Sequence, residues 1–407
     1  LDRPDSFIEK RKWLNGYYFR NLIIPFLISI ALVIRASFFQ RRRDPSAFAE
    51  IDPSNLVEGI LVLLAIPFLL SRRGLRAIRL IFNGPLRYYI FYTLWCFVAT
   101  FWSSDVVYSM FRVIELLVGL FIFAYIFIDI RSKEYAKRVL LYFIVISLIA
   151  GIGYHLKSGW ISFEYFHSNT YPMIAAVGVV VGFLIFKDRK YFEYDYPHLK
   201  YISFFLFTIS LVGVVFGTSS ASNLSLVVAI ILIISLRKSS SMTFFFLLTS
   251  FLLLWASWEN YQEQIIKVIF PGKSLASIQT GHGRVGFWKL YIEGFLERPI
   301  FGYGFPTGEK EGFKYGFGLT NSSHNMFLSV AINTGIVGLL LFLLWIIKYS
   351  RFLLKKLREG YLDMKWIIGA WIVFLVNSLS VPALGSHWFW ITSSAFCVMV
   401  YSVVYYK

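Results

Sequence analysis

Residues 324–347 read HNMFLSVAINTGIVGLLLFLLWII, a run of 24 residues that contains no Asp, Glu, Lys or Arg. A helix needs about 20 mostly apolar residues to cross the hydrocarbon core of a bilayer. This run is therefore long enough to span a membrane. It differs from the other apolar runs of the chain because polar residues begin it, at His324-Asn325, and interrupt it, at Asn333-Thr334-Gly335.

The composition extends this interpretation to the whole chain. The 407 residues are 57% hydrophobic and 19% aromatic, with a mean hydropathy of +0.63, whereas a soluble domain has about 45–50% apolar residues. We therefore expect an all-α, polytopic integral membrane protein. The formal charge of +17 is then typical of basic cytoplasmic loops rather than of nucleic-acid binding. The two cysteines, Cys96 and Cys397, lie in apolar runs and offer neither a disulfide framework nor a CxxC metal site.

The apolar runs predict about 12 transmembrane helices, and the first is expected to be a span rather than a cleavable signal peptide. Their approximate ranges are 21–39, 55–70, 88–102, 110–130, 139–156, 169–186, 201–217, 222–236, 241–257, 324–347, 366–383 and 386–405. The seventh and eighth runs meet at Gly217-Thr218-Ser219-Ser220, where one span could be broken or re-entrant. Such irregular backbone is tolerated at membrane depth only inside protein or against water.

Basic residues predict the orientation. With the N-terminus in the cytoplasm, 27 of the 40 Lys and Arg residues fall on the cytoplasmic side, as the positive-inside rule requires. Both termini are then cytoplasmic, and segment 258–323 is a large outer loop with short helices. It separates spans 1–9, in residues 1–257, from spans 10–12, in residues 324–407. The exception is Arg41-Arg42-Arg43, an outer run suited either to lipid headgroups or to attracting an anionic substrate.

The outer segment and its borders contain the residues best suited to chemistry. Arg284 follows Gly283 at the start of a predicted helix, Arg284–Leu296, where free N–H groups and a guanidinium fork suit phosphate oxygens. His324 stands at the bilayer boundary, where it could act as a general base or as a diphosphate ligand. Arg112 is a charged residue at membrane depth and so a functional candidate, although Glu115, three residues on, could simply pair with it.

The order of these motifs resembles a known family. The succession Gly283-Arg284, Trp288, Glu297-Arg298-Pro299, Gly302-Tyr303-Gly304, Ser323-His324-Asn325 and Gly335-Ile336-Val337-Gly338 is similar to the signature region of the O-antigen ligase and Wzy-type polysaccharide polymerase superfamily. Trp102-Ser103-Ser104-Asp105 leading to Arg112, and Phe166-His167-Ser168-Asn169-Thr170, resemble further elements of its exopolysaccharide polymerases. In total, recognisable pieces cover about 230 residues.

The resemblance implies a GT-C type membrane glycosyltransferase of a bacterial inner membrane. Such an enzyme uses an undecaprenyl-diphosphate-linked glycan at the periplasmic face and needs neither metal nor cofactor. It implies that Arg284 and His324 are catalytic. We also expect the diphosphate and glycan to contact some of the following residues: Arg112, Gly283, Ser219, Ser220, His167, Asn169, Asn325, Trp288 and Tyr303. The aromatic members could stack on sugars or anchor the protein at the interface.

Three functions remain open at this point. A polymerase would join repeat units, with a lipid-linked glycan as acceptor and with inversion at the anomeric carbon; a flippase and a chain-length regulator are possible partners. A ligase would transfer the glycan to lipid A–core, but the arginine that ligases often carry before the loop is missing from Thr218-Ser219-Ser220-Ala221-Ser222, which favours the polymerase. A lipid-linked glycan transporter ranks last, because no related halves are visible in the sequence.

Overall fold

The computed structural model describes residues 16–38, 53–157, 161–162, 165–166, 171–187, 197–217, 219–235, 284–312, 322–381, 384–385 and 390–407; within these segments, the side chains of Ser220 and Arg284 are not described. Helices make up nearly all of this part, as the composition predicts. The difference is a small antiparallel pair of two-residue strands, β1 (Ile161–Ser162) and β2 (Tyr165–Phe166), with Ile161 opposite Phe166.

The helices follow one another along the chain with short connections. They are α2 (Gly16–Phe38), α3 (Pro53–Leu70), α4 (Arg72–Phe82), α5 (Arg87–Ala99) with the 3₁₀ turn η1 (Thr100–Trp102), α6 (Val106–Phe127), α7 (Lys133–Lys157), α8 (Tyr171–Lys187), α10 (Pro197–Phe216), α11 (Ser220–Ser235), α15 (Arg284–Glu297), α17 (Met326–Arg358), α18 (Met364–Asn377) and α19 (Trp390–Tyr406).

Each predicted span falls on one of these helices, except 241–257, which lies outside the described residues. Within the described residues, four helices contain a stretch long and apolar enough to cross a membrane: α6, α7, α10 and α17. Six further apolar helices are shorter, at 10–17 residues. The protein therefore has the helices of a membrane protein, and the number of twelve crossings stays a prediction.

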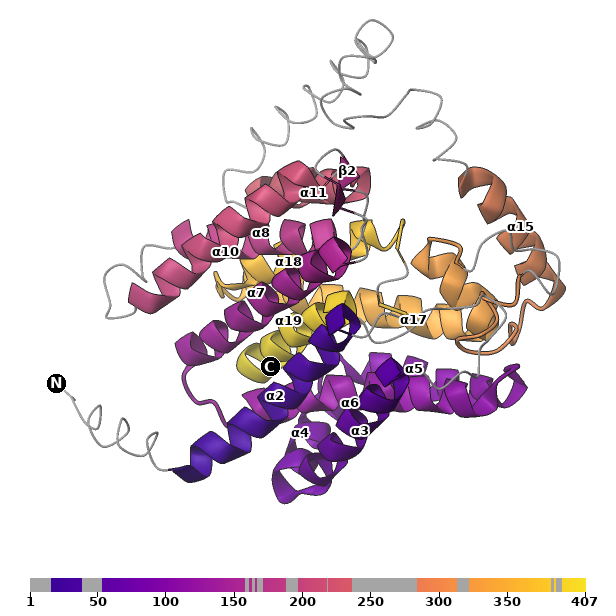
Figure 1. Cartoon of the computed structure of the whole chain (residues 1–407), viewed down its shortest axis with the longest axis horizontal. Helices are drawn as coiled ribbons and strands as arrows, with labels where there is room; N and C mark the ends of the chain where they lie inside the picture. The colour runs from indigo at the N-terminus through magenta and orange to yellow at the C-terminus, as the bar shows by residue number, and fades with distance from the viewer. Residues whose placement is uncertain are drawn as a thin grey trace, which may run out of the picture.

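Two helices occupy the interior of the bundle (Figure 1). α8 is buried by α7, α10, α11 and α18, and α6 is buried by α2, α3, α4, α5 and α19. α17 packs on α5 and α18 and also contacts α15, which lies at the edge of the molecule. Both cysteines are free and buried among apolar side chains, as their positions in the sequence predict.

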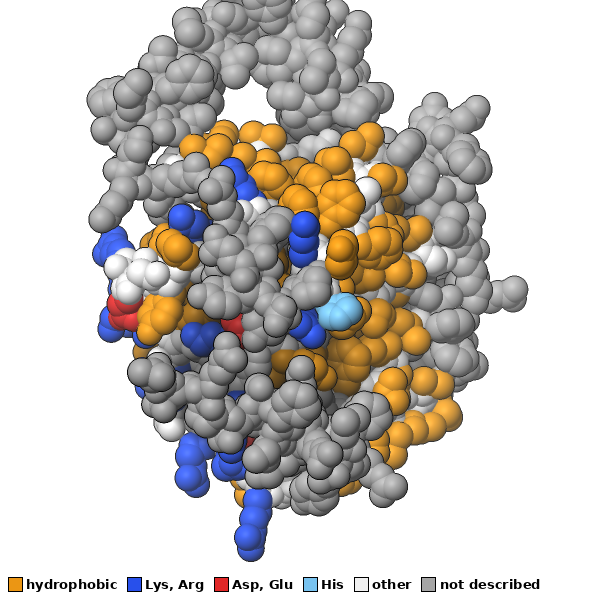
Figure 2. Space-filling model, turned by 90° about the vertical axis from the view of Figure 1, so that its left-hand side faces the viewer, with side chains coloured by type: hydrophobic (Ala, Val, Ile, Leu, Met, Phe, Trp, Pro, Cys, Tyr) orange, Lys and Arg blue, Asp and Glu red, His pale blue; other side chains and the backbone are white. Residues whose placement is uncertain are grey.

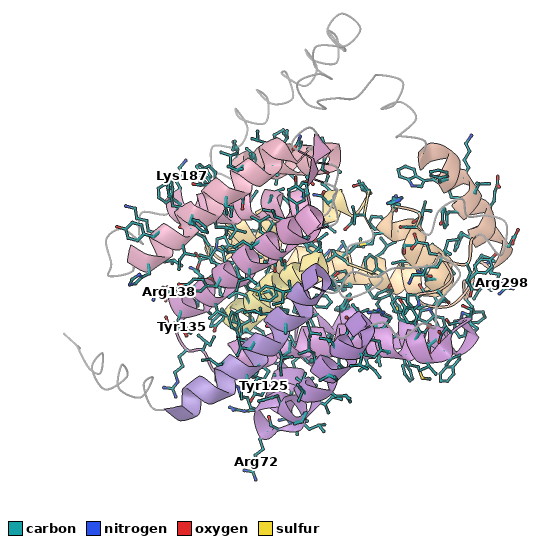
Figure 3. The ribbon with its side chains drawn as sticks, viewed as in Figure 1. Arg72, Tyr125, Tyr135, Arg138, Lys187 and Arg298 are labelled. Carbon is teal, nitrogen blue, oxygen red and sulfur yellow. The ribbon has the colours of Figure 1, made fainter. Side chains whose placement is uncertain are left out.

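The outer surface of the bundle is apolar along its sides and basic at one end. Val215 and Tyr201 on α10 are 67% and 66% exposed, and Leu63 on α3 is 66% exposed. Contiguous exposed apolar surface of this kind suits contact with lipid. Figure 3 places Arg138 and Lys187 at one end of the molecule and Arg298 at the other, and Figure 2 shows Lys and Arg gathered on the first of these ends.

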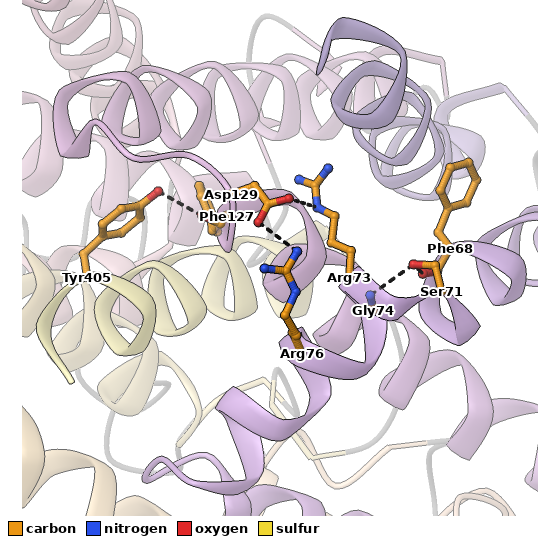
Figure 4. Close-up of polar contacts among 8 residues, drawn as sticks. All are labelled: Phe68, Ser71, Arg73, Gly74, Arg76, Phe127, Asp129 and Tyr405. Atoms are coloured by element: carbon orange, nitrogen blue, oxygen red, sulfur yellow. Dashed lines mark hydrogen bonds and ion pairs between the residues drawn. The ribbon is translucent and has the colours of Figure 1, made fainter. Parts of the chain in front are cut away.

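The basic end is held together by contacts among several helix ends (Figure 4). Asp129, after α6, accepts from Arg73 at 3.0 Å and lies 3.5 Å from Arg76, both on α4. Ser71 caps α4 by accepting from the Gly74 N–H at 3.1 Å, as side-chain oxygens do at helix starts. The sequence analysis assigned residues 72–87 to a loop, and α4 corrects this, because a short basic helix lacks the long apolar run that marks a span.

Candidate functional site

The end of the bundle opposite this basic end is built around a break in α17. Gly335 has φ 68° and ψ −170°, so α17 consists of two helical parts that meet at this residue. The sequence analysis expected one continuous span at 324–347, and the break corrects that expectation. Only glycine adopts this backbone conformation readily. A Cβ at position 335 would lie 2.0 Å from the carbonyl oxygen of Ile300, so the break also permits close approach of another segment.

That segment is the turn after α15. Its backbone pairs with the groups that the break leaves without helical partners. The N–H of Tyr303 donates to the Ile332 carbonyl at 2.8 Å, and the N–H of Gly304 donates to the Asn333 carbonyl at 3.1 Å. In return, the N–H of Ile336 donates to the Pro299 carbonyl at 2.8 Å. Buried backbone groups need such partners, so the Arg298–Gly304 motif completes the broken helix.

The same turn is fixed on its other side by the connection between α5 and α6. The Ser103 hydroxyl lies 2.7 Å from both the Thr307 and the Ser109 hydroxyl. Gly304, at φ 105°, packs so closely that a Cβ there would lie 2.5 Å from the Cα of Ser103. The Trp102-Ser103-Ser104-Asp105 motif and the Gly302-Tyr303-Gly304 motif, about 200 residues apart in the sequence, therefore form one surface.

His324 sits in a turn directly before α17. It has φ 51°, the only positive value among the described non-glycine residues. Non-glycine residues in this conformation are held there by their surroundings and occur often at functional sites. Ser322 accepts from the His324 N–H at 3.2 Å, and Ser323 accepts from the Asn325 N–H at 3.3 Å. The turn presents His324 where the sequence predicted it, at the start of the span.

Asn325 has a structural role in this turn. Its Oδ1 accepts from the backbone N–H groups of Phe327 at 2.9 Å and Leu328 at 3.2 Å, so it is the N-cap of α17. Its predicted contact with substrate is untested by this geometry. The cap fixes the direction in which the chain enters α17, and so the position of His324.

α15 brings the Arg284 region to the same turn. The Trp288 indole Nε1–H donates to the Ser323 carbonyl at 2.9 Å, one residue before His324. Arg284 is the first residue of α15, and residues four apart lie on one face of a helix. Arg284 therefore starts the helical turn that Trp288 fixes beside His324. Tyr303 is 2% exposed and donates to the Gly294 carbonyl at 3.0 Å, which ties α15 to the turn that follows it.

A buried network of small polar side chains joins α11 to α18. Ser222 donates to Ser219 at 3.1 Å and to Asn377 Oδ1 at 3.0 Å, and Asn377 Nδ2 donates to Ser225 at 2.6 Å. The next residue, Ser378, accepts from the Met326 N–H at 2.9 Å. Ser219 is thus connected to the start of α17, and the network contains no charged side chain.

Arg112 belongs to a different cluster. Its Nη1 donates to Glu115 on α6 at 2.7 Å and to Glu58 on α3, and all three side chains are at most 1% exposed. The guanidinium also lies over the Tyr108 ring, while its Nε and Nη2 have no hydrogen-bond partner in the described part of the chain. The pairing with Glu115 that the sequence left open is present, and Glu58 is an addition.

Some predicted site residues lie outside the described part of the chain. These are Gly283, His167 and Asn169, together with the side chains of Arg284 and Ser220. Segment 258–283 and the predicted outer arginines, Arg41-Arg42-Arg43, also lie outside it. Their predicted roles stay predictions.

The broken helix, the strained histidine and the helix that begins at Arg284 are consecutive parts of one matched region. Residues 204–343 match the O-antigen ligase family. This confirms the resemblance to the O-antigen ligase and Wzy-type superfamily, because the match runs from α10 to the second part of α17 and includes Ser219, Arg284 and His324. A search of curated proteins finds no match.

The O-antigen ligase family consists of glycosyltransferase-like ligases and polymerases whose substrates are in general lipid-linked glycans. The match and the apolar helices together indicate a membrane protein of polysaccharide biosynthesis. The match does not include Glu58, Arg112 or Asn377. These residues nevertheless form buried polar contacts at the same end of the bundle.

The sequence analysis missed Glu309, which lies at the centre of the site. Its carboxylate accepts from the Ser323 N–H and from the Ser329 hydroxyl, and it is 5% exposed. Burial raises the pKa of the Glu309 carboxyl above its ordinary value, although these donors lower it in part. Nothing in the sequence distinguishes this glutamate from a solvated loop residue, since the residues that bury it come from α15 and α17.

Proposed function

We propose that this protein is a polysaccharide polymerase of the outer face of a bacterial cytoplasmic membrane. It joins repeat units that are carried on undecaprenyl diphosphate. The observation that carries the proposal is the hydrogen bond from Trp288 to the Ser323 carbonyl, at 2.9 Å. It couples the first turn of α15, where Arg284 lies, to the strained turn of His324, so that a cation for diphosphate and a proton acceptor share one end of the bundle.

In the proposed reaction, a sugar hydroxyl of the acceptor attacks the anomeric carbon of the donor glycan. The new bond is between that hydroxyl oxygen and the anomeric carbon, and the bond from the anomeric carbon to the diphosphate oxygen breaks. The lipid diphosphate leaves with the electron pair, and Arg284 neutralises its growing charge. His324 accepts the hydroxyl proton, a role that contributes typically 10²–10⁴-fold to rate. One displacement inverts the anomeric centre.

Arg112 is left out of this proposed reaction as a diphosphate ligand. Two buried carboxylates, Glu58 and Glu115, already pair with its guanidinium, so the cluster as a whole carries no excess positive charge for an anion. Its contribution is proposed to be indirect. Tyr108, which lies under the Arg112 guanidinium, accepts from Lys310 at 2.9 Å, and Lys310 follows Glu309 in the turn beside His324.

The small polar network at Ser219 favours polymerisation over ligation. Ligases of the superfamily often carry an arginine in the stretch before the loop, as the resemblance implies, whereas Ser219, Ser222 and Asn377 occupy this place as a buried network without charge. Ligation to lipid A–core is the second candidate, because the matched family is described by that activity. Both functions use the same donor chemistry and differ in the acceptor.

A reconstitution assay separates the candidates. Purified protein in liposomes, given only the lipid-linked repeat unit, should produce a ladder of longer lipid-linked glycans. Transfer that occurs only after lipid A–core is added would select the ligase, and translocation without a new glycosidic bond would select a transporter. Arg284→Ala and His324→Ala should abolish transfer while the purified proteins keep the wild-type melting temperature. Near-normal turnover of either variant would remove that residue from the mechanism.

A further inference from the structure

Glu309 holds the His324 turn from both sides. One carboxylate oxygen accepts from the N–H of Ser323, the residue before His324, and the other accepts from the hydroxyl of Ser329, more than one turn into α17. Ser322 adds a third donor at 3.4 Å. A single buried side chain therefore bridges the loop before His324 and the helix after it.

The backbone of Glu309 is held as firmly as its carboxylate. Its N–H donates to Asn333 Oδ1 at 3.0 Å, and its carbonyl accepts from the Tyr291 hydroxyl at 3.4 Å. Asn333 lies two residues before the break in α17, and Tyr291 lies on α15. The three parts of the site, α15, the His324 turn and the broken helix, thus converge on this one residue.

We propose that Glu309 is a positioning residue for His324, which holds its strained turn in place and supplies a negative charge beside it. This inference rests on the proposed function, because it gives His324 the task of accepting a proton. A carboxylate near a histidine stabilises the imidazolium that forms when the proton is accepted. All three donors to the Glu309 carboxylate suit its ionised form, since each presents a hydrogen to an oxygen.

Other ionisable groups also lie around Glu309 in the described part of the chain. They are Tyr291 on α15, His324 before α17, and Lys310 and Glu311 on its own segment, with Tyr108 of α6 reached through Lys310. The Lys310 ammonium sits over the Tyr108 ring at 4.9 Å. A test of Glu309 must therefore remove its charge and leave these neighbours unchanged.

The decisive variant is Glu309→Gln, which keeps the size of the side chain and an acceptor oxygen for the Ser323 N–H. We expect kcat in the reconstituted assay to fall about tenfold or more, with the KM for the lipid-linked donor little changed. We also expect the limb of the pH–rate profile that depends on His324 to move to lower pH by about one unit, because loss of a nearby negative charge disfavours the imidazolium. The melting temperature should stay at or above the wild-type value.

A conservative variant tests the charge separately from the fit. Glu309→Asp keeps the charge but shortens the side chain, so it should restore the position of the pH limb and only part of kcat. Glu293→Gln is the matched control, because it removes the same charge from an exposed position on α15. The control should leave both kcat and the pH profile at their wild-type values.

The outcomes are distinct. If Glu309→Gln keeps the wild-type kcat and pH profile, or if it loses activity only as far as its melting temperature falls, Glu309 has no positioning role. His324→Ala measured in parallel separates the two proposals. An active His324→Ala protein overturns the proposed function itself, whereas an inactive His324→Ala with a normal Glu309→Gln overturns only the inference about Glu309.

Discussion

The substitution Gly335→Ala tests the broken helix, on which the whole site depends. An alanine Cβ at this position would lie 2.0 Å from the Ile300 carbonyl oxygen, 2.3 Å from its carbon and 2.6 Å from the Phe301 nitrogen. All three are backbone atoms, so no side-chain rotation relieves the contact. The alanine must also adopt a φ near 68°, which is unfavourable for any residue with a Cβ.

The cost of this substitution follows from two contributions. Holding a non-glycine residue in such a conformation costs about 1–3 kcal/mol. Relief of the clash requires the turn at Pro299–Tyr303 to move away from α17, and this breaks the hydrogen bonds from Ile336 to Pro299 and from Tyr303 to Ile332, each 2.8 Å long. At about 1 kcal/mol for each bond, the free energy of unfolding should fall by about 3–5 kcal/mol in total.

The control for this prediction is Gly286→Ala. Gly286 is exposed within α15, and a Cβ there has no heavy atom within 4 Å. The same chemical change should therefore stabilise the protein by about 0.5–1 kcal/mol, since alanine favours a helix more than glycine does. Melting curves of both variants in one detergent give the comparison. An equal melting temperature for Gly335→Ala and wild type would refute the close packing at the break.

Three further predictions concern buried polar groups. Arg112→Met should destabilise the protein by about 3–5 kcal/mol, because it leaves Glu58 and Glu115 buried without their cation; loss of activity at an unchanged melting temperature would instead support a substrate contact. Asn377→Leu should cost about 1–3 kcal/mol, because it leaves the buried serine hydroxyls around it unsatisfied, and an unchanged melting temperature would contradict the network. Burial raises the folded-state pKa of Glu309 above its ordinary 4.5, so wild type should gain stability relative to Glu309→Gln as pH falls from the raised value towards about 4.5; the opposite trend in melting temperature would contradict the direction of the shift.

The helices were predictable because each depends on a local property of the chain. A run of about 15–20 apolar residues has one stable solution in lipid, a helix that satisfies its own backbone. The start of α15 at Arg284 and its end at Glu297 were predictable for a similar reason, because apolar residues recur at helical spacing and Pro299 cannot continue the helix. These features need no knowledge of other segments.

The contacts of the site were not predictable because they join distant segments. Arg112 meets Glu58, 54 residues away in the sequence, and Trp288 meets the carbonyl of Ser323, 35 residues away. The sequence did suggest the Arg112–Glu115 pair, which is local to one helix. It gave no sign of Glu58 as a partner, since an acidic residue at the start of an apolar run is compatible with exposure to headgroups.

The break at Gly335 shows why a polar interruption in an apolar run is ambiguous. Asn333-Thr334-Gly335 was visible in the sequence, yet a glycine inside a helix usually continues it at a cost of about 1 kcal/mol. The break forms here because another segment supplies the lost hydrogen bonds, through Pro299, Tyr303 and Gly304. The Trp95 indole adds a bond of 2.9 Å to the Thr334 carbonyl. Whether a helix breaks therefore depends on the partner as much as on the glycine.

The distribution of charge at this end of the bundle assigns the roles within the proposed site. Among the described residues, the Arg112 charge is offset by two carboxylates, and Arg298 is exposed and lies over the Tyr303 ring at the far end of α15. The polar groups closest to the His324 turn are serines, asparagines and Glu309, which suit proton transfer rather than anion binding. A diphosphate therefore depends on the cation at position 284. The chemistry divides along the structure: α15 holds the leaving group, and the turn fixed by Glu309 receives the proton.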